Sequence, residues 1–197
     1  MEPTPDEILV QRVQRGDQVA FELLVMKYQR RIFRLIMRFI RDPSQAEDVA
    51  QETFLRAYRA IAQFRGDSQF YTWLYRIAVN TAKKALAEGA RELSLRDQPG
   101  ETDETSAHDA QLSDMETPEA VLAGRQVART VNDAMDELPE DLRTAIALRE
   151  IEGMSYEDIA QVMSCPVGTV RSRIFRAREA IARRLRPLLG KKSGARW

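Results

Sequence analysis

Arginine, serine and phenylalanine side chains gather on one side of a predicted helix near the C-terminal end of the sequence: Arg171, Ser172, Arg173, Phe175, Arg176 and Arg178. Ser172, Phe175 and Arg176 follow Arg171 by one, four and five residues. This spacing places the four side chains on one helix face. Side chains of these types reach base edges in the major groove, and arginine suits bidentate bonding to guanine. Between Cys165 and Trp197 there are ten Lys or Arg and a single acid, Glu179. This local positive charge favours DNA as the ligand.

Two helices and a tight turn are predicted to position this face. The first helix follows Ser155 and has a short apolar side, made of Ile159, Ala160, Val162 and Met163. Proline lacks a backbone N–H and suits a first helical turn, so Ser164-Cys165-Pro166 ends one helix and starts another. The second helix has its own apolar stripe: Val167, Val170, Ile174, Ala177, Ile181 and Leu185. The pattern predicts a helix-turn-helix with the recognition helix second. Ser164 stands where many such turns carry glycine, which predicts a mildly strained or differently shaped turn.

A second candidate surface combines aromatic and basic residues. Five of the fourteen aromatic residues fall between positions 64 and 75, and basic or amide side chains follow: Phe64, Phe70, Tyr71, Trp73, Tyr75, Arg76, Asn80, Lys83 and Lys84. Unpaired bases stack on aromatic faces while cations hold the phosphates, so this stretch suits single-stranded nucleic acid. Aromatic residues at helical spacing are more often core, however. The periodicity turns Phe70 and Leu74 inward and Tyr71, Tyr75 and Arg76 outward.

The composition predicts an all-α protein in a reducing compartment. The chain has 197 residues, 44% hydrophobic and 30% charged, with few glycines and prolines, enough for one medium domain or two small ones. Its net charge is zero, so any nucleic-acid surface must be local. The single cysteine, Cys165, excludes an internal disulfide and fits a reducing compartment. The sequence shows neither a signal peptide nor a run of ~20 apolar residues, which predicts a cytoplasmic protein without membrane insertion. One histidine and one cysteine form no zinc set and no nucleophile–base pair, so we expect no enzyme, metal or cofactor.

The helical pattern divides the chain into two small helical domains joined by a flexible acidic linker. Acids, Pro, Gly, Ser and Thr accumulate in this linker and large apolar residues almost vanish, so it cannot offset its ordering entropy. It is also a candidate to screen the basic helix in the free protein. His108 lies within it, where an unremarkable exposed role is expected. The predicted boundaries are 1–90 for the first domain, 91–117 for the linker, 118–190 for the domain with the helix-turn-helix, and 191–197 for a disordered tail.

Capping residues indicate where several helices begin. Asp17 is predicted to cap the second helix, and Ser44 with Glu47 forms a capping-box pattern for the third. Thr117 is predicted to cap the first helix of the second domain. The helix that starts near Phe70 is expected to end near Ala87.

Long runs of the sequence resemble one family. FRGDSQFYTWLYRIAVNTAKK, LPEDLRTAIALRE and SYEDIAQVMSCPVGTVRSRIFRAREAI are similar to the extracytoplasmic-function sigma factors of bacterial RNA polymerase, closest to the envelope-stress sigma-E type. The resemblance covers about residues 5–90 and 118–187. It implies two helical domains on a flexible linker, promoter-specific initiation of a stress regulon, and control by a membrane-anchored anti-sigma factor.

The resemblance also implies roles for individual residues. The second domain would read the promoter −35 element as duplex through Arg171, Ser172, Phe175 and Arg176, with Arg149 and Arg178 nearer the phosphates. The first domain would bind the melted −10 strand through Phe64, Ser68, Phe70, Trp73, Tyr75, Arg76, Asn80 and Lys83. Core RNA polymerase would be bound through the flap of its second-largest subunit and through the clamp helices of its largest, which would meet Asp48, Gln51 and Glu52.

Other classes of function were weighed against this one. A stand-alone helix-turn-helix transcriptional regulator would bind promoter duplex tightly by itself, but leaves the aromatic and basic stretch unexplained. A metal-dependent nuclease built on Asp48 and Glu52 would cleave DNA when a divalent metal is added, and we expect no cleavage. A helical scaffold does not account for the arginine face.

Overall fold

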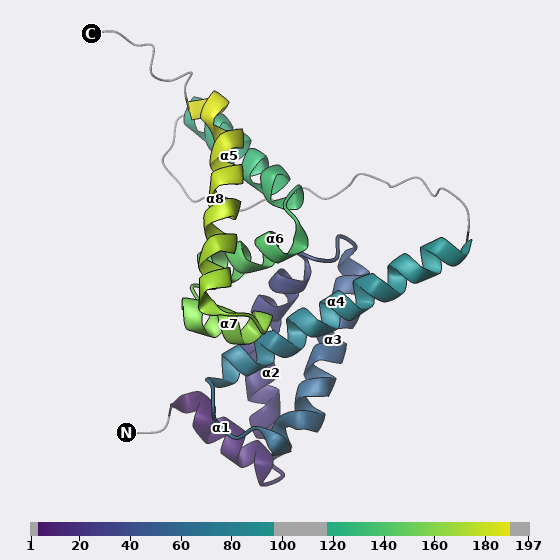
Figure 1. Ribbon diagram of the computed structural model, residues 1–197. Helices are drawn as coiled ribbons and strands as arrows, with labels where there is room; N and C mark the ends of the chain where they lie inside the picture. The colour runs from purple at the N-terminus through teal and green to yellow at the C-terminus, as the bar shows by residue number, and fades with distance from the viewer. Residues whose placement is uncertain (1–3, 97–117, 190–197) are drawn as a thin grey trace.

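The computed structural model describes residues 4–96 and 118–189, and each regular element within these ranges is helical (Figure 1). The predicted cap Thr117, the predicted tail and most of the predicted acidic linker, His108 included, lie outside the described residues. The all-α prediction is confirmed. In the described ranges, none of the helices combines the length and apolar character needed to cross a membrane.

Four helices and a single 3₁₀ turn form the N-terminal domain: α1 (Pro5–Gln14), α2 (Gln18–Ile36), α3 (Pro43–Ala60), η1 (Ile61–Gln63) and α4 (Phe70–Arg96). The apolar stripes of α2 and α4 recur at helical spacing and meet in its core, where Leu24, Ile32, Ile36 and Leu74 are almost completely buried. The helix predicted to end near Ala87 continues to Arg96. In Figure 1 its far end extends beyond the other helices.

The starts of α2 and α3 test the predicted caps. The backbone N–H of Ala20 donates to the Asp17 carboxylate at 3.1 Å, so the predicted cap of α2 is confirmed. The capping box predicted at Ser44 is wrong. Asp42 caps α3 by accepting from the Ser44 N–H at 3.0 Å, because Pro43 takes the first helical position and starts the helix two residues earlier than predicted.

The C-terminal domain consists of α5 (Pro118–Asp136), α6 (Glu140–Ile146), the π-helical turn η2 (Ala147–Ile151), α7 (Tyr156–Met163) and α8 (Val167–Leu189). The long α8 packs against α5, α6 and α7 (Figure 1). Its inner side closes the core of this domain, where Ile159, Val162, Val170 and Ile174 are buried.

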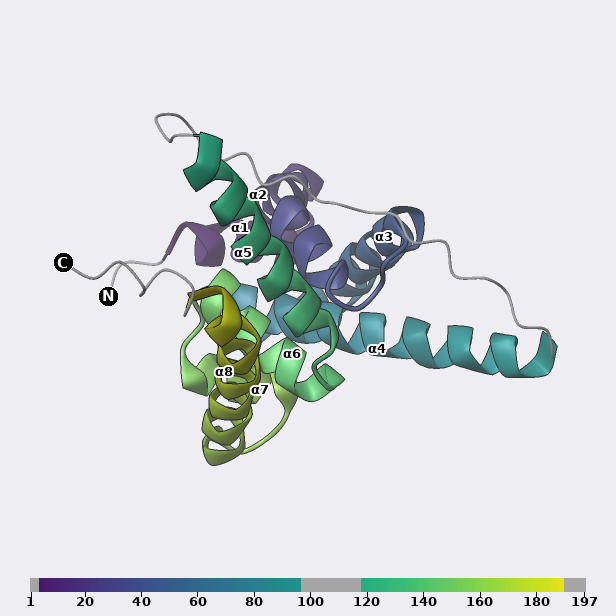
Figure 2. The same cartoon turned by 90° about the horizontal axis from the view of Figure 1, so that it is seen from above.

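The two domains are in direct contact. Helix α7 packs on α4, as the view from above also shows (Figure 2). Arg143 of α6 donates to the backbone carbonyl of Arg38, just beyond α2, at 3.2 Å. The helix-turn-helix therefore lies against the same helix that carries most of the aromatic and basic stretch.

Candidate nucleic-acid interface

The helix-turn-helix is built as the sequence predicts, with α7 first and α8 second. Ser155 caps α7 by accepting from the backbone N–H of Asp158 at 3.0 Å. Ser164 ends α7 in the left-handed conformation, with φ 51° and ψ 47°, and is the one described non-glycine residue with a positive φ. The prediction of a mildly strained turn at this position is therefore confirmed.

One face of α8 is open. Phe175 is 68% exposed, which is unusual for a large apolar side chain, and its three predicted partners on the face are also exposed: Arg171, Ser172 and Arg176. The opposite side of the same helix is buried in the core through Val170, Ile174 and Ala177. The domain thus holds the four candidate base-reading residues together on one helix, with their side chains exposed.

The two flanking arginines are already engaged within the domain. Arg149 donates to the carbonyl of Met154 at 2.7 Å, and its guanidinium lies 4.8 Å from the centre of the Tyr156 ring. Arg178 forms an ion pair with Glu150 at 2.5 Å. Hydrogen bonding to Glu150 raises the pKa of Arg178, so this arginine stays charged but is partly neutralised by its partner.

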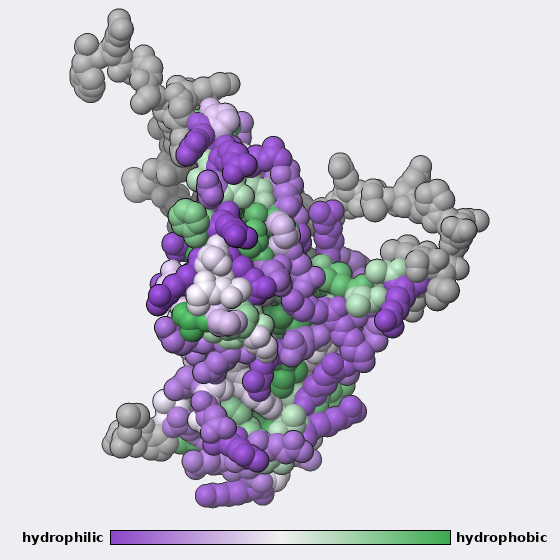
Figure 3. Space-filling view, in the orientation of Figure 1, coloured by the Kyte–Doolittle hydropathy of each residue, from purple (hydrophilic) through white to green (hydrophobic). Residues whose placement is uncertain are grey.

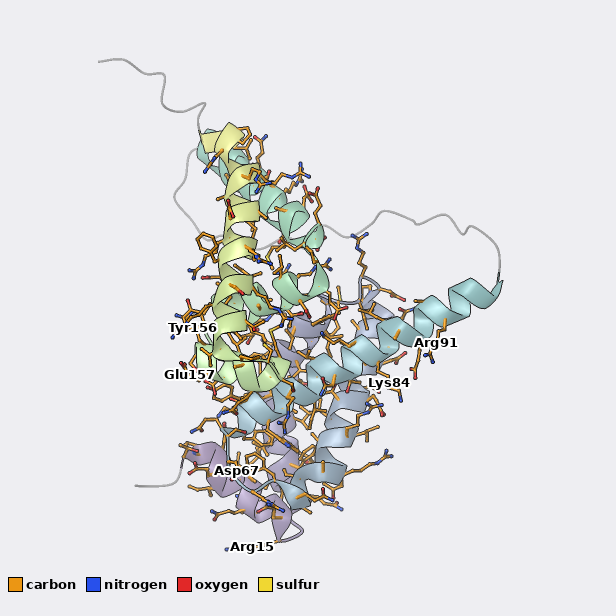
Figure 4. The ribbon with its side chains drawn as sticks, in the orientation of Figure 1. Arg15, Asp67, Lys84, Arg91, Tyr156 and Glu157 are labelled. Carbon is orange, nitrogen blue, oxygen red and sulfur yellow. The ribbon has the colours of Figure 1, made fainter. Side chains whose placement is uncertain are left out.

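Tyr156 is a residue of this surface that the sequence reasoning missed. Figure 4 shows the position of Tyr156. The guanidinium groups of Arg149 and Arg171 lie 4.8 Å and 5.9 Å from the centre of its ring. These contacts hold both arginines near the start of α7. An aromatic residue directly after the helix-capping serine was the available signal.

Arg173 does not lie on the open face, although its position in the arginine-rich run suggested so. Its guanidinium pairs with Asp141 at 2.5 Å and donates to the sulfur of Cys165 at 3.4 Å. Arg173 therefore ties α8 to α6 and to the turn. Cys165 is half-buried and acts as a small packed residue at the turn.

The aromatic stretch forms one cluster at the start of α4. The rings of Phe64, Phe70 and Trp73 lie 5.2–6.1 Å apart between centroids. Phe70 is 4% exposed and also contacts Tyr28, so it supports the cluster from within the core. Phe64 and Trp73 are half-buried and keep part of their rings accessible.

The loop before α4 is anchored by the last residue of α1. The side-chain amide of Gln14 donates to the carbonyls of Ile61 and Phe64, each at 2.9 Å. Gly66 takes a φ of +79°, which turns the chain toward Ser68. Asp67, next to Gly66, is exposed (Figure 4).

The remaining candidates on α4 divide into two groups. Arg76 and Asn80 are exposed. Tyr75 is only 2% exposed, so the expectation that it turns outward is wrong: the C-terminal domain covers this side of α4, and the Tyr75 hydroxyl donates to Glu152. Burial and this hydrogen bond raise the pKa of Tyr75. Lys83 is half-buried and pairs with Glu140 and Asp141 of α6.

The candidate polymerase-binding residues lie on α3. Asp48 and Gln51 are exposed, and Glu52 pairs with Arg56 at 2.7 Å, a contact that lowers the pKa of Glu52. Leu55, next along this surface, is 52% exposed and was missed. Leu55 falls outside the buried stripe of α3, and a large apolar residue outside that stripe was the available signal of a binding surface.

Hydrophilic residues cover most of the face of the molecule that Figure 3 shows, with separate apolar areas between them. In the part of the chain that the structure describes, no cluster of three or more His, Cys, Asp or Glu could hold a metal ion. The described residues present two surfaces, the exposed face of α8 and the aromatic cluster at the start of α4.

Known proteins share both halves of this arrangement. The Sigma-70 region 2 family model matches residues 24–92, and the Sigma-70 region 4 model matches residues 128–181. The RNA polymerase sigma-H factor of Pseudomonas aeruginosa is 58% identical over 184 residues, which are 93% of this chain and 95% of that protein. The ECF RNA polymerase sigma-E factor of Haemophilus influenzae is 51% identical over 188 residues, 95% of this chain and 99% of that protein.

A solved structure agrees with these relatives. The sigma factor RpoE of Bartonella quintana, in complex with the anti-sigma factor NepR, aligns with a TM-score of 0.68 and 26% identity over 89% of this chain and 98% of that one. Because the matches cover both domains, a stand-alone helix-turn-helix regulator is not favoured, and neither is an enzyme. The chain belongs to the extracytoplasmic-function sigma factors, the transcription initiation factors that direct bacterial RNA polymerase to promoters.

Proposed function

We propose that this sigma factor reads the −35 promoter element as duplex with α8 and binds the −10 element as a melted strand with the N-terminal domain. The observation that carries the proposal is the open face of α8, where Arg171, Ser172, Phe175 and Arg176 are exposed on a helix whose other side is buried. A helix of this kind fits the major groove, and its arginines suit guanine edges. Arg149, Arg178 and Tyr156 border the face and lie nearer the phosphates.

The N-terminal domain contributes a stacking surface. Phe64 and Trp73 offer partly exposed rings, while Arg76 and Asn80 offer polar groups along α4. Opening DNA costs about 1.4 kcal/mol per base-pair step, and stacking an unpaired base on an aromatic ring returns ~1–3 kcal/mol. One small aromatic cluster therefore supports only a short melted region. We expect strict promoters that match both elements.

Binding to core polymerase completes the function. Asp48, Gln51 and Glu52, with the exposed apolar Leu55 beside them, form a mixed polar and apolar surface suited to the clamp helices of the largest subunit. The C-terminal domain would meet the flap of the second-largest subunit. Because the protein would act on RNA polymerase, its location would be the cytoplasm. The RpoE–NepR complex supports control by an anti-sigma factor, and the family resemblance suggests that this partner is membrane-anchored.

Promoter-directed transcription tests the proposal. Purified protein and core polymerase are given a template with a sigma-E-like promoter, and the discrete transcript is measured. Losing the base contact of Arg176 by Arg176→Ala is expected to weaken promoter binding by about 1–3 kcal/mol, or ~5- to 150-fold. Asn80→Ala removes an exposed side chain of α4 and should reduce open-complex formation without affecting folding.

The matched control is Arg15→Ala, which removes an exposed arginine that belongs to neither set of assigned residues (Figure 4). Its transcript should equal that of the wild-type protein. If all three variants transcribe alike, the assignment of the two faces is refuted. Tight binding of promoter duplex by the protein alone, without any transcript, would favour a stand-alone regulator.

A further inference from the structure

Carboxylates of the C-terminal domain hold three hydroxyl groups of α4. Tyr71 and Thr72 each donate to Asp158 of α7, at 2.9 Å, and Tyr75 donates to Glu152. Thr72 is 1% exposed and Tyr75 2% exposed, so these hydroxyls are sealed between the domains. Buried hydroxyls that lose such acceptors are costly, which makes the contact specific.

A second group of contacts lies further along α4. The ammonium of Lys83 is 3.0 Å from Glu140 and 3.2 Å from Asp141 of α6. The same Asp141 accepts from Arg173 of α8 at 2.5 Å. One carboxylate thus connects α4 of the first domain with the recognition helix of the second.

The titration of these groups agrees with a charged contact at neutral pH. Burial raises the pKa of Asp158, but hydrogen bonds from Ser155, Tyr71 and Thr72 lower it more, so the net pKa lies below its ordinary value. For Lys83, burial lowers the pKa and the two carboxylates raise it more. Asp158 is therefore an anion and Lys83 a cation in the closed protein.

The chemistry of this contact matches that of a nucleic-acid backbone. Hydroxyl and ammonium donors of α4 that could hold phosphate oxygens are instead occupied by carboxylate oxygens. Two of them, Tyr75 and Lys83, are among the residues assigned to the melted −10 strand. Neither can serve both partners, since Tyr75 is buried and Lys83 is paired on the C-terminal domain.

The promoter also requires the domains to separate. Elements centred at −35 and −10 lie about 25 base pairs apart, roughly 85 Å at 3.4 Å per pair. A compact chain of 197 residues has a radius of gyration of only about 16 Å. A protein with its domains in hydrogen-bonding contact cannot reach both elements at once.

We propose that the C-terminal domain inhibits the N-terminal domain in the free protein, and that Asp158, Glu152 and Asp141 compete with the melted promoter strand for α4. The proposal rests on the −10 role assigned to α4 above. It locates self-inhibition in residues of α6 and α7 and in the segment just after η2. Polymerase binding would then part the domains and release Tyr75 and Lys83 when the strand is to be bound.

The test opens the contact from both sides in the full-length protein. Glu152→Gln removes the acceptor charge on the C-terminal domain, and Tyr71→Phe removes one donor on α4 but keeps the ring. Each change is expected to shift the closed-to-open ratio toward open by up to about tenfold, the equivalent of ~1.4 kcal/mol. The matched control is Glu157→Gln, which removes the same charge from an exposed position on α7 (Figure 4).

Two quantities are measured without polymerase. Small-angle scattering gives the radius of gyration, and fluorescence anisotropy gives the affinity for a single-stranded −10 oligonucleotide at fixed salt. Because apparent affinity scales with the open fraction, the two opening variants should expand and bind the strand about three- to tenfold more tightly, while the control matches wild type. Thermal unfolding confirms that each variant is folded.

Each result has one interpretation. If the opening variants keep wild-type dimensions, or expand without any gain in strand affinity, self-inhibition by strand competition is refuted. The transcription assay reports on the proposed function separately: a wild-type protein that fails to direct transcription and whose open variants bind no strand refutes the −10 assignment itself.

Discussion

The left-handed serine at the turn of the helix-turn-helix leads to a direct prediction: Ser164→Gly stabilises the protein. Ser164 has φ 51° and ψ 47°, and its backbone N–H closes the end of α7 on the carbonyls of Ala160 and Gln161. Residues with a Cβ are strained in this conformation, whereas glycine adopts it freely. The turn must keep its shape because α7 and α8 pack closely on either side.

The size of the effect follows from two opposing terms. Relief of the left-handed conformation is worth roughly 1–2 kcal/mol, and the greater freedom of glycine in the unfolded chain costs about 0.5–1 kcal/mol. The net gain expected for Ser164→Gly is ~0.5–1 kcal/mol. For a chain of 197 residues this corresponds to a rise of about 1–4 °C in Tm.

Urea and thermal unfolding, followed by circular dichroism, measure the gain. Two variants isolate its cause. Ser164→Ala keeps the strain and should leave stability close to wild type, while Gly153→Ala introduces strain at a φ of +68° and should destabilise. The reasoning is refuted if Ser164→Gly brings no gain, or if Ser164→Ala stabilises equally, since the side chain and not the backbone would then be responsible.

Three further outcomes are expected. Asp42→Ala should lower the free energy of unfolding by ~1 kcal/mol in urea because it removes the cap of α3. Ser44→Ala, at the second position of the helix, should cost much less, and equal losses would contradict the observed cap. The pKa of Asp158 is lowered in the closed protein, so its contribution to domain closure is present above the ordinary value of 3.8 and is lost as the pH falls below that value. Small-angle scattering should show a larger radius of gyration at acid pH than at neutral pH. Constant dimensions would argue against a role of Asp158 in closure. Leu55→Ala should leave thermal unfolding nearly unchanged, since Leu55 is 52% exposed. It should weaken binding to core polymerase severalfold, measured by fluorescence anisotropy with Arg15→Ala as the control. An unchanged affinity would show that Leu55 is not part of the polymerase-binding surface.

Local patterns predicted the elements well and their mutual contacts poorly. The stripe from Val170 to Ala177 is buried as expected, because a helix that packs within its own domain has a period that can be read from its sequence. Tyr75 was expected to turn outward, but it is 2% exposed and its hydroxyl donates to Glu152 of the C-terminal domain. That acceptor lies about eighty residues later in the chain, and periodicity along α4 contains no information about it.

The candidate site shows the same division. The open face of α8 was predicted residue by residue, because a basic exposed stripe and an apolar buried one alternate on a single helix. Arg173 was placed on the wrong side of α8, because its partner Asp141 approaches from α6. Tyr156 was missed, because its role depends on Arg149, which approaches from η2. Asp42 was overlooked because both Asp42 and Ser44 are residue types that cap helices, and only Pro43 decides between them.

The hydrogen bonds of Gln14 determine what can be separated from the rest of this molecule and still work. The region 2 match begins at residue 24, inside α2, yet the base of the aromatic loop is held by a side chain ten residues earlier, and Val10 and Val13 belong to the same core. A fragment that begins at the border of the family match would lose helix α1 from its core, and with it the hydrogen bonds from Gln14 that hold the loop before α4. The smallest piece that could bind a strand on its own therefore begins no later than Thr4, the residue that caps α1.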